Sequence, residues 1–465
     1  MAKRLTKFDF DLVVIGSGAA GSVAAETVAA TGRRVALVEA ATFGGYVPNF
    51  GDIPRHALLN AAHIFAGLRA AERFGLRTNS VGYSFPSLKN WESTVIRRSG
   101  AARTAEYLRS KNIMVYRGRA HFISRNEISI GQQRHISAAK FLVATGSQPQ
   151  VPHIQGLENV NYLTAKTALT LNRPPKSLVI VGAGASGVEL AESFAIFGTK
   201  VYLVERAPRI LPKFDVEVSN EIGQLLHKKY SVDIITSAQV VSAANDDMMV
   251  RLQITRGGVV RALRVEQILL VTGATPNTDI GLVNAGVKFD NHGASVNQFL
   301  QTTSKNIYAV GDVIGPDASD VATAIRRSQI AGYNLTNRDQ KSISTIVAPR
   351  VAWTDPAVAT VGATEEELAA RRIKHQVSLV NNSVTMRANI TDAAPGLTKL
   401  IIGARGQILG ATIISKAAVD QIGQITLAMQ NNLSLQQLAD VIQPFGAWSE
   451  TLALATADIK RKGGE

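Results

Sequence analysis

Two glycine-rich segments have the spacing that brings a peptide backbone against a phosphate group. The first covers residues 16–21 (GSGAAG), and the second covers residues 182–187 (GAGASG). Glycines at this spacing allow a tight turn. Its N–H groups and the N-terminus of the following helix donate hydrogen bonds to a pyrophosphate. A carboxylate follows each segment at a similar distance, Glu39 and Glu205, where it can accept hydrogen bonds from ribose hydroxyls.

The elements that must position these segments are strand, turn, helix and a second strand. Short apolar runs precede each glycine turn, and a second apolar run ends in each carboxylate. This order is typical of a dinucleotide-binding unit. The predicted elements are strands over 9–15, 34–39, 177–181 and 200–205, and helices over 22–31 and from 188 onwards.

Three further apolar runs are predicted to extend these units. Residues 141–146 and 268–273 both end in Thr-Gly, and residues 306–312 end in Gly311-Asp312. Two dinucleotide units in one chain indicate a flavin facing a nicotinamide, which is the arrangement for hydride transfer.

With these motifs in place, the chain resembles the flavoprotein disulfide reductase family, which includes dihydrolipoamide dehydrogenase, glutathione reductase and mercuric reductase. Gly311-Asp312 matches the family motif whose Asp binds the flavin ribityl chain. Residues 351–362, 397–402 and 407–411 match the C-terminal interface domain. The resemblance covers essentially the whole length.

The resemblance implies an α/β fold with two Rossmann-like dinucleotide-binding domains and a C-terminal α+β dimerisation domain. It implies an FAD-binding domain over residues 1–150 and 277–345, and a nicotinamide-nucleotide domain over residues 151–276. Residues 346–465 would form the interface of a homodimer. The length of 465 residues, which predicts about three domains, agrees with this division.

The departures from the family concern its redox chemistry. The chain has no cysteine, and the segment that holds the redox disulfide in the family reads GGYVPNFGDIP over residues 44–54. Val47 and Asp52 stand at the two thiol positions. In the C-terminal motif Phe445 replaces the catalytic His, whereas Glu450 is kept. A dithiol relay needs a thiolate and a base, so disulfide and mercuric-ion reduction are excluded.

The candidate catalytic residues follow from the positions that remain. Glu189 matches the family Glu beside the nicotinamide, which pairs with a Lys near the flavin; Arg55 or His56 takes the place of that Lys. The catalytic candidates are Asp52, Arg55, His56, Glu189, Phe445 and Glu450. The cofactor-binding candidates are Gly16, Ser17, Gly18, Ala19, Ala20, Gly21, Glu39, Ala40, Gly44, Gly45, Ala120, Thr145, Gly146, Gly182, Gly184, Gly187, Glu205, Arg206, Gly273, Gly311 and Asp312.

These residues predict an FAD-dependent oxidoreductase that takes hydride from a reduced nicotinamide nucleotide and delivers electrons to a small non-disulfide acceptor such as a quinone. Glu205 favours NADH, whereas Arg206 keeps NADPH as the alternative donor. Two other functions stay open. One is a soluble transhydrogenase, in which a second nicotinamide nucleotide is the acceptor, and the other is a dimeric FAD-binding scaffold without catalysis.

Composition narrows the remaining classes. The formal net charge is +14, but no nucleic-acid motif accompanies it, so we expect attraction to anionic cofactors and no nucleic-acid partner. The eight histidines are scattered, and no metal is expected. No apolar run is long enough to span a bilayer and no signal segment is recognisable, so the sequence predicts a cytoplasmic protein without membrane attachment.

Overall fold

The computed structural model of the chain describes residues 7–77, 80–99, 103–315 and 320–462. The chain forms two compact units, which are described separately below. The first unit comprises Met1–Ala57, Lys89–Gln150 and Gly273–Thr345. The second unit comprises Leu58–Leu88, Val151–Thr272 and Ile346–Glu465.

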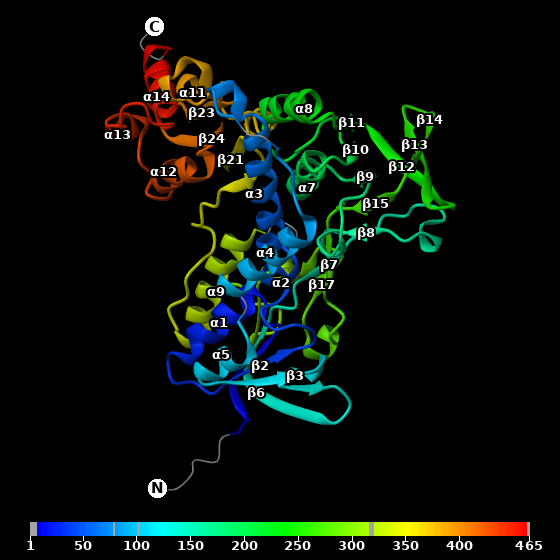
Figure 1. Ribbon diagram of the computed structural model, residues 1–465. Helices are drawn as coiled ribbons and strands as arrows, with labels where there is room; N and C mark the ends of the chain where they lie inside the picture. The colour runs from blue at the N-terminus through cyan, green and yellow to red at the C-terminus, as the bar shows by residue number, and fades with distance from the viewer. Residues whose placement is uncertain (1–6, 78–79, 100–102, 316–319, 463–465) are drawn as a thin grey trace. The chain divides into compact units, whose positions relative to one another are not determined.

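A seven-stranded sheet forms the centre of the first unit (Figure 1). Its strands are β1 (Phe10–Ile15), β2 (Val35–Glu39), β3 (Ile113–Arg117), β4 (Ala120–Ser124), β5 (Glu127–Ile130), β6 (Arg134–Val143) and β19 (Ile307–Ala309). β3, β2, β1, β6 and β19 are parallel neighbours in this order, whereas β4 and β5 continue from β6 as antiparallel strands. The parallel part is therefore a dinucleotide-binding sheet with an antiparallel extension.

Two helices pack side by side against this sheet (Figure 1). They are α1 (Ala19–Ala29) and α9 (Val321–Thr336). Gly332 of α9 permits the close approach, because a Cβ there would lie 2.8 Å from Cβ of Thr27. The unit also contains α2 (Tyr46–Phe50), α5 (Ala105–Ser110), β7 (Ser147–Pro149) paired with β16 (Ala274–Pro276), and β17 (Phe289–Asp290) paired with β18 (Gly293–Ala294). α3 (Asp52–Arg69) and α4 (Phe85–Arg98) each continue from one unit into the other.

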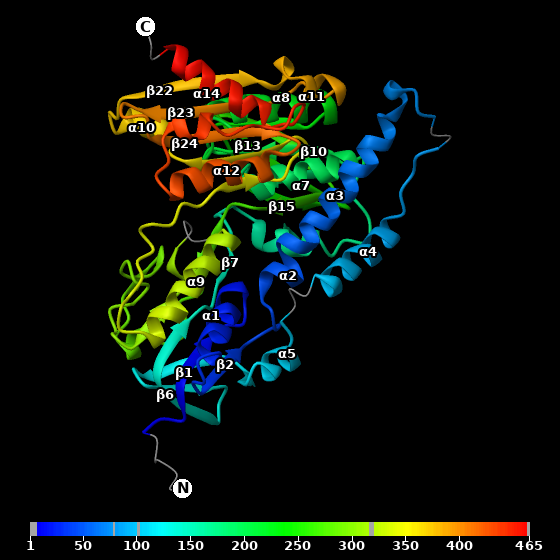
Figure 2. The same cartoon turned by 90° about the vertical axis from the view of Figure 1, so that its left-hand side faces the viewer.

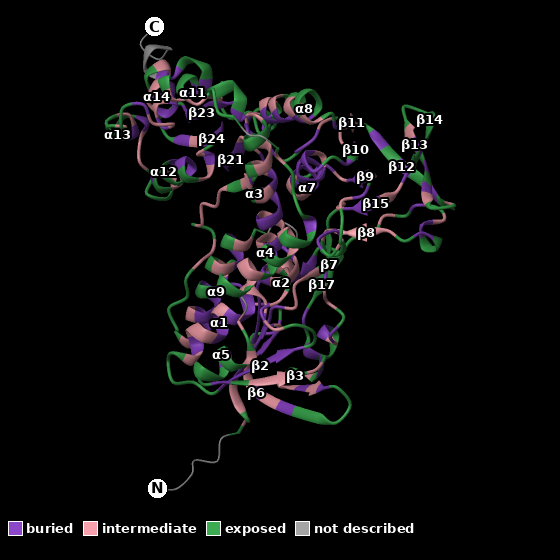
Figure 3. Cartoon of the chain, in the orientation of Figure 1, coloured by how far each residue is buried: buried purple, intermediate pink, exposed green. Residues whose placement is uncertain are grey.

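The second unit contains a parallel sheet in the order β11-β10-β9-β15-β8. Its strands are β8 (Leu163–Thr164), β9 (Ser177–Val181), β10 (Lys200–Val204), β11 (Asp233–Ile235) and β15 (Gln267–Leu270). One face packs against α7 (Ala185–Ile196) and α8 (Val216–Tyr230). The other face packs against an antiparallel meander of β12 (Ala238–Asp246), β13 (Met249–Arg256) and β14 (Val259–Val265). Because both faces are covered, the central strands are buried, as Figure 3 shows for β9 and β10.

The C-terminal part of this unit is an antiparallel sheet in the order β20-β21-β24-β23-β22. The strands are β20 (Arg350–Ala352), β21 (Ala357–Gly362), β22 (His375–Asn381), β23 (Leu397–Gly403) and β24 (Ile408–Ser415). α12 (Ala418–Gln430) and α14 (Glu450–Lys462) pack on one face (Figure 2). The shorter helices are α10 (Glu365–Ala370), α11 (Met386–Ile390) and α13 (Leu435–Ala439).

The predicted strands are present in both dinucleotide-binding sheets. The helices begin three residues earlier than predicted, at Ala19 and Ala185, because Gly18 and Gly184 are themselves the N-cap residues. The predicted domain boundaries stay a prediction, since the compact units group residues 58–88 with the second unit. Over the described ranges, no helix has the length and apolar character needed to cross a membrane.

Candidate functional site

The first glycine turn combines two packed positions with one open position. Gly16 has φ +103°, and a Cβ there would overlap the carbonyl oxygen of Ala144. Gly21 lies inside α1, where a Cβ would overlap the carbonyl oxygen of Gly16. A Cβ at Gly18 would meet no atom within 4 Å. Gly16 and Gly21 thus allow the chain to pack, whereas Gly18 leaves space before a helix N-terminus for a pyrophosphate.

The second glycine turn repeats this geometry in the second unit. Gly182 has φ +104°, and a Cβ there would overlap the carbonyl oxygen of Val271. A Cβ at Gly187 would overlap the carbonyl oxygen of Gly182, and a Cβ at Gly184 would meet no atom within 4 Å. The chain therefore contains two cradles of the same construction.

Glu39 is held in place by the first glycine turn. Its Oε2 accepts hydrogen bonds from N and Oγ of Ser17 at 2.8 and 2.6 Å, and its Oε1 accepts one from N of Ala41 at 2.8 Å. The Ser17 hydroxyl also accepts a hydrogen bond from N of Gly44 at 3.1 Å. These bonds fix the carboxylate at the end of β2. The two carboxylate oxygens still have acceptor capacity for ribose hydroxyls.

Glu205 is held in the same way in the second cradle. Its Oε2 accepts a hydrogen bond from N of Ala183 at 2.7 Å, and its Oε1 accepts one from N of Ala207 at 2.8 Å. Both donors occupy the positions that Ser17 and Ala41 occupy around Glu39. The carboxylate predicted to select the nicotinamide nucleotide is therefore oriented before any ligand binds.

The two arginines after Glu205 differ in their surroundings. Arg206 is exposed. Arg209 is paired with Glu366, with Nη1 at 2.8 Å and Nη2 at 2.5 Å from the carboxylate oxygens. Arg206 is consequently the better placed of the two to meet a 2′-phosphate.

Asp312 is a half-buried acid of the first unit. Its Oδ2 accepts a hydrogen bond from the hydroxyl of Ser147 at 2.7 Å, a partner that the sequence analysis did not identify. Burial raises the pKa of the Asp312 carboxyl, the Ser147 hydrogen bond lowers it, and the negative charge of Asp52 raises it further. The charge of Asp52 is thus close enough to affect the Asp312 carboxyl. The other predicted residues of this unit lie in α1 or at strand ends and in loops: Ala19, Ala20, Ala40, Gly44, Gly45, Ala120, Thr145, Gly146, Gly273 and Gly311.

The N-terminal turn of α3 carries three of the predicted catalytic residues. Asp52 Oδ1 lies 2.5 Å from Nη2 of Arg55, an ion pair between positions i and i+3. Burial lowers the pKa of the neighbouring His56 to about 4, and the charge of Arg55 contributes to this shift. His56 is therefore neutral near pH 7, and Arg55 is the cation of this turn. The residues of this unit fit an FAD, because the unit contains both the open cradle at Gly18 and the fixed Glu39.

Glu189 is almost completely buried in α7, with 1% of its surface exposed. Its Oε1 accepts a hydrogen bond from N of Trp353 at 2.9 Å. One turn further along α7, Oε1 of Glu192 accepts a hydrogen bond from N of Asp355 at 3.2 Å. The segment that joins β20 to β21 thus orients both carboxylates. The pairing of Glu189 with the cation at α3 stays a prediction.

Glu192 belongs to a buried polar cluster that the sequence analysis missed. Nε2 of His63 lies 3.5 Å from Oε1 of Glu192. Over the described ranges, the Tyr230 hydroxyl and Oε2 of Glu192 have no hydrogen-bond partner. Burial raises the pKa of Glu192 and that of Tyr230, and the charge of Glu192 adds to the shift of Tyr230. No group of three His, Asp or Glu side chains suited to a metal ion occurs in the described part of the chain.

The raised pKa of Glu192 makes stability depend on pH. Ionisation of the buried carboxyl costs free energy, so stability is lost as pH rises from the ordinary carboxyl pKa towards the raised one. We expect Glu192→Gln to gain stability relative to the wild type between pH 5 and pH 8, by about 1.4 kcal/mol for each unit of the shift. Urea unfolding at both pH values measures this. The exposed Glu158, replaced in the same way, should show no such trend, and a pH-independent effect at Glu192 would refute the prediction.

The C-terminal candidates lie just before and at the start of α14. Phe445 is 85% exposed. Glu450 is the first residue of α14, and over the described ranges its buried Oε2 has no hydrogen-bond partner. In the described part of one chain, the Phe445 ring is thus left in water and one Glu450 oxygen is left without a donor.

Two glycine cradles with matched carboxylates, followed by an antiparallel C-terminal sheet, define a chain with two dinucleotide-binding folds and an interface domain. The sequence profile described as pyridine nucleotide-disulphide oxidoreductase matches residues 10–332, and that of its dimerisation domain matches residues 348–456. The chain belongs to the pyridine nucleotide-disulphide oxidoreductase family. The resemblance and the fold class predicted from the sequence are confirmed.

Individual relatives agree with this assignment. The chain is 32% identical to mercuric reductase of Streptomyces lividans, with 97% of each chain covered. It is 30% identical to dihydrolipoyl dehydrogenase of Bacillus subtilis, covering 93% of this chain and 92% of that one. Among solved structures, the HOCl-induced flavoprotein disulfide reductase RclA from Escherichia coli matches with a TM-score of 0.85 and 27% identity, over 96% of this chain and 99% of that chain. The family consists of FAD-dependent NAD(P)H oxidoreductases, but this chain has no cysteine and hence no redox disulfide.

Proposed function

We propose that the chain is an FAD-dependent NADH oxidoreductase that delivers electrons to a small non-disulfide acceptor of quinone-like chemistry. The observation that supports this most directly is the retention of both complete cradles in a chain without cysteine. A scaffold that kept FAD only for its structure would have no use for the oriented Glu205 or for the open space at Gly184.

The residues of the first unit would hold FAD through its pyrophosphate, its ribose and its ribityl chain. The turn at Gly18 would receive the pyrophosphate, Glu39 the adenosine ribose, and Asp312 the ribityl hydroxyls. When bound, FAD supplies the capacity to take a hydride from a nicotinamide and to release two electrons to an acceptor. Arg55 would contribute positive charge at the start of α3, because His56 is neutral near pH 7.

The acceptor side is proposed from the positions of the lost thiols. Val47 and Asp52 replace the two cysteines, and Phe445 of the partner subunit would replace the catalytic histidine. This set is mostly apolar with one carboxylate, which suits a flat aromatic acceptor. Without a thiolate or the histidine base, neither a disulfide nor a mercuric ion would be reduced.

Homodimer formation is part of the proposal, since the C-terminal residues match a dimerisation domain. The exposure of Phe445 supports it, because covering an exposed aromatic side chain with a second subunit lowers the free energy. Other exposed apolar residues of this part are Val384, Met386, Ile390, Leu427, Val441 and Ile442.

Anaerobic stopped-flow mixing of the FAD-loaded protein with NADH or NADPH tests the function and the choice of donor. We expect NADH to bleach the flavin faster than NADPH, because Glu205 accepts hydrogen bonds from ribose hydroxyls and repels a 2′-phosphate. Glu205→Ala should shift the ratio of the two rates towards NADPH by roughly 1–3 kcal/mol, on the order of tenfold or more. Arg206→Ala should change the rate with NADH little.

Three results would contradict this assignment. A flavin that keeps its colour with both nucleotides would support the scaffold. A wild type that prefers NADPH, and loses that preference on Arg206→Ala, would place the chain with phosphate-selective enzymes. Rapid reoxidation by an oxidised nicotinamide analogue, with no reoxidation by quinones, would favour a transhydrogenase.

A further inference from the structure

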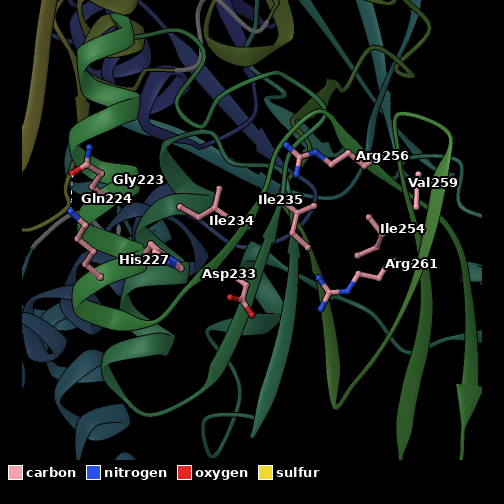
Figure 4. A pocket seen from close by; sticks show the side chains of 11 residues that line it. Gly223, Gln224, His227, Asp233, Ile234, Ile235, Ile254, Arg256, Val259 and Arg261 are labelled. Carbon is pink, nitrogen blue, oxygen red and sulfur yellow. Dashed lines mark hydrogen bonds between the residues drawn. The ribbon is translucent and has the colours of Figure 1, made fainter.

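A cavity of about 790 Å³ lies on the second unit, and one of its lining residues, Ile235, accepts a backbone hydrogen bond from N of Glu205. Its walls are the C-terminal half of α8, the edge strand β11 and the hairpin of β13 and β14 (Figure 4). Gly182, Gly184 and Glu205 are not among the residues that line it. The volume is typical of small-molecule sites, which measure about 300–1,000 Å³.

Two arginines line the cavity from the hairpin of β13 and β14. Along β13, the buried face carries Val250, Leu252 and Ile254, and Arg256 is the next residue on that face. Along β14, the buried Leu263 is preceded on the same face by Arg261, which lies directly opposite Ile254. Both arginines are exposed, so their guanidinium groups are accessible to a ligand.

Both guanidinium groups point from the hairpin towards β11 and α8 (Figure 4). Within the described ranges, neither Arg256 nor Arg261 forms an ion pair or a side-chain hydrogen bond. Lys228 adds a third cation from α8. The only acid of the lining, Asp233, is paired with Lys200 at 2.9 Å. The cavity therefore has positive charge that no residue of the unit compensates, and this favours an anion.

The lining also contains four apolar side chains, beside Gln224 and His227 of α8. Ile234 and Ile235 come from the edge strand, and Ile254 and Val259 come from the hairpin. Ile254 is already buried, but a purely inorganic anion would leave the half-buried Ile234 and Ile235 and the exposed Val259 in contact with water. A ligand with an apolar body would cover them and gain the free energy of apolar burial, about 25 cal/mol per Å².

We infer that this cavity binds a small organic anion. Its anionic group would lie between Arg256 and Arg261, and its apolar body would lie against Ile234 and Ile235. The site is independent of the proposed oxidoreductase function. It requires no rearrangement of the cradle at Gly184.

Isothermal titration of the FAD-loaded protein, saturated with NAD+, with 1-naphthyl phosphate tests the site. We expect saturable binding that the double variant Arg256→Ala/Arg261→Ala weakens at least tenfold. The matched control is Arg251→Ala/Arg264→Ala, which removes the same charge from directly opposed residues on the outer face of the same hairpin. This control should alter the affinity less than twofold.

Two further probes separate the parts of the ligand. Inorganic phosphate, which has no apolar body, and 1-naphthol, which has no anion, should each bind at least tenfold more weakly than 1-naphthyl phosphate. The inference is overturned if the naphthyl probe does not bind saturably, or if the control double variant weakens it equally. It is also overturned if inorganic phosphate binds as tightly as the naphthyl ester.

Discussion

Gly184→Ala is expected to weaken NADH binding at least tenfold, about 1.4 kcal/mol, while FAD stays bound and the chain stays folded. The backbone at Gly184 has φ −70°, which alanine adopts without strain, and its Cβ would meet no protein atom within 4 Å. The added methyl group would instead occupy the space before α7 that a pyrophosphate requires. The concentration dependence of flavin reduction by NADH measures the affinity.

The equivalent substitution in the first cradle is the control. Gly18 has φ −61° and the same open space, so Gly18→Ala should lower the FAD content of the purified protein and leave the second cradle intact. Gly182→Ala should prevent folding, because its Cβ would overlap the carbonyl oxygen of Val271. If Gly184→Ala released FAD as readily as Gly18→Ala, the two cradles would not be independent and the prediction would fail.

Lys399→Met is expected to destabilise the protein by about 3–5 kcal/mol, the cost of breaking a buried ion pair from one side. Only 1% of the Lys399 side chain is exposed, and Nζ lies 2.6 Å from Glu365, 2.9 Å from Glu217 and 3.2 Å from Asp215. Burial alone would lower the pKa of Lys399, but the hydrogen bonds with Glu365 and Glu217 raise it overall. The part of the stabilisation that depends on the lysine proton is therefore fully present below the ordinary lysine pKa and is lost as pH rises through the raised pKa. Chemical unfolding at pH 7 measures the loss.

Asp215 determines the size of this effect. It is 2% exposed, and after the substitution it would keep hydrogen bonds from the Thr412 hydroxyl and from N of Glu365 but lose its cation. Adding Asp215→Asn should therefore recover part of the loss in a double-mutant cycle. Lys374→Met, at an exposed lysine of the same domain, should cost less than about 0.5 kcal/mol. Equal losses for Lys399 and Lys374 would show that the buried pair contributes nothing.

The sequence was sufficient to predict the features that depend on local pattern. The strands before residues 16 and 182, and the acids that end the following strands, are separated by short distances along the chain. Glycine spacing and apolar runs therefore located both cradles. The helices α1 and α7 begin three residues before the predicted starts. Glycine is a weak helix former, so the pattern did not mark Gly18 and Gly184 as N-cap residues.

The features that the sequence did not reveal join residues far apart in the chain. Lys399 and Asp215 are separated by 184 positions. A signal was present, since a lysine within the apolar run of residues 397–402 requires a buried partner, but no local rule identifies that partner. The contact of His63 with Glu192 is of the same kind. By contrast, the ion pair of Asp52 with Arg55 follows from helical spacing and was within reach of sequence reasoning.

The segment that joins β20 to β21 has a consequence for how this family of chains can evolve. Its backbone N–H groups satisfy Glu189 and Glu192, which are buried in α7 of the nucleotide-binding part. A gene that lost or exchanged the C-terminal domain would leave these two acids in an apolar interior without donors, and would leave Asp215 without its cation. Recombination at the boundary between the two domains would therefore cost stability, and it would also divide a hydrophobic cluster in which Val358 and Ile414 lie with residues of α7.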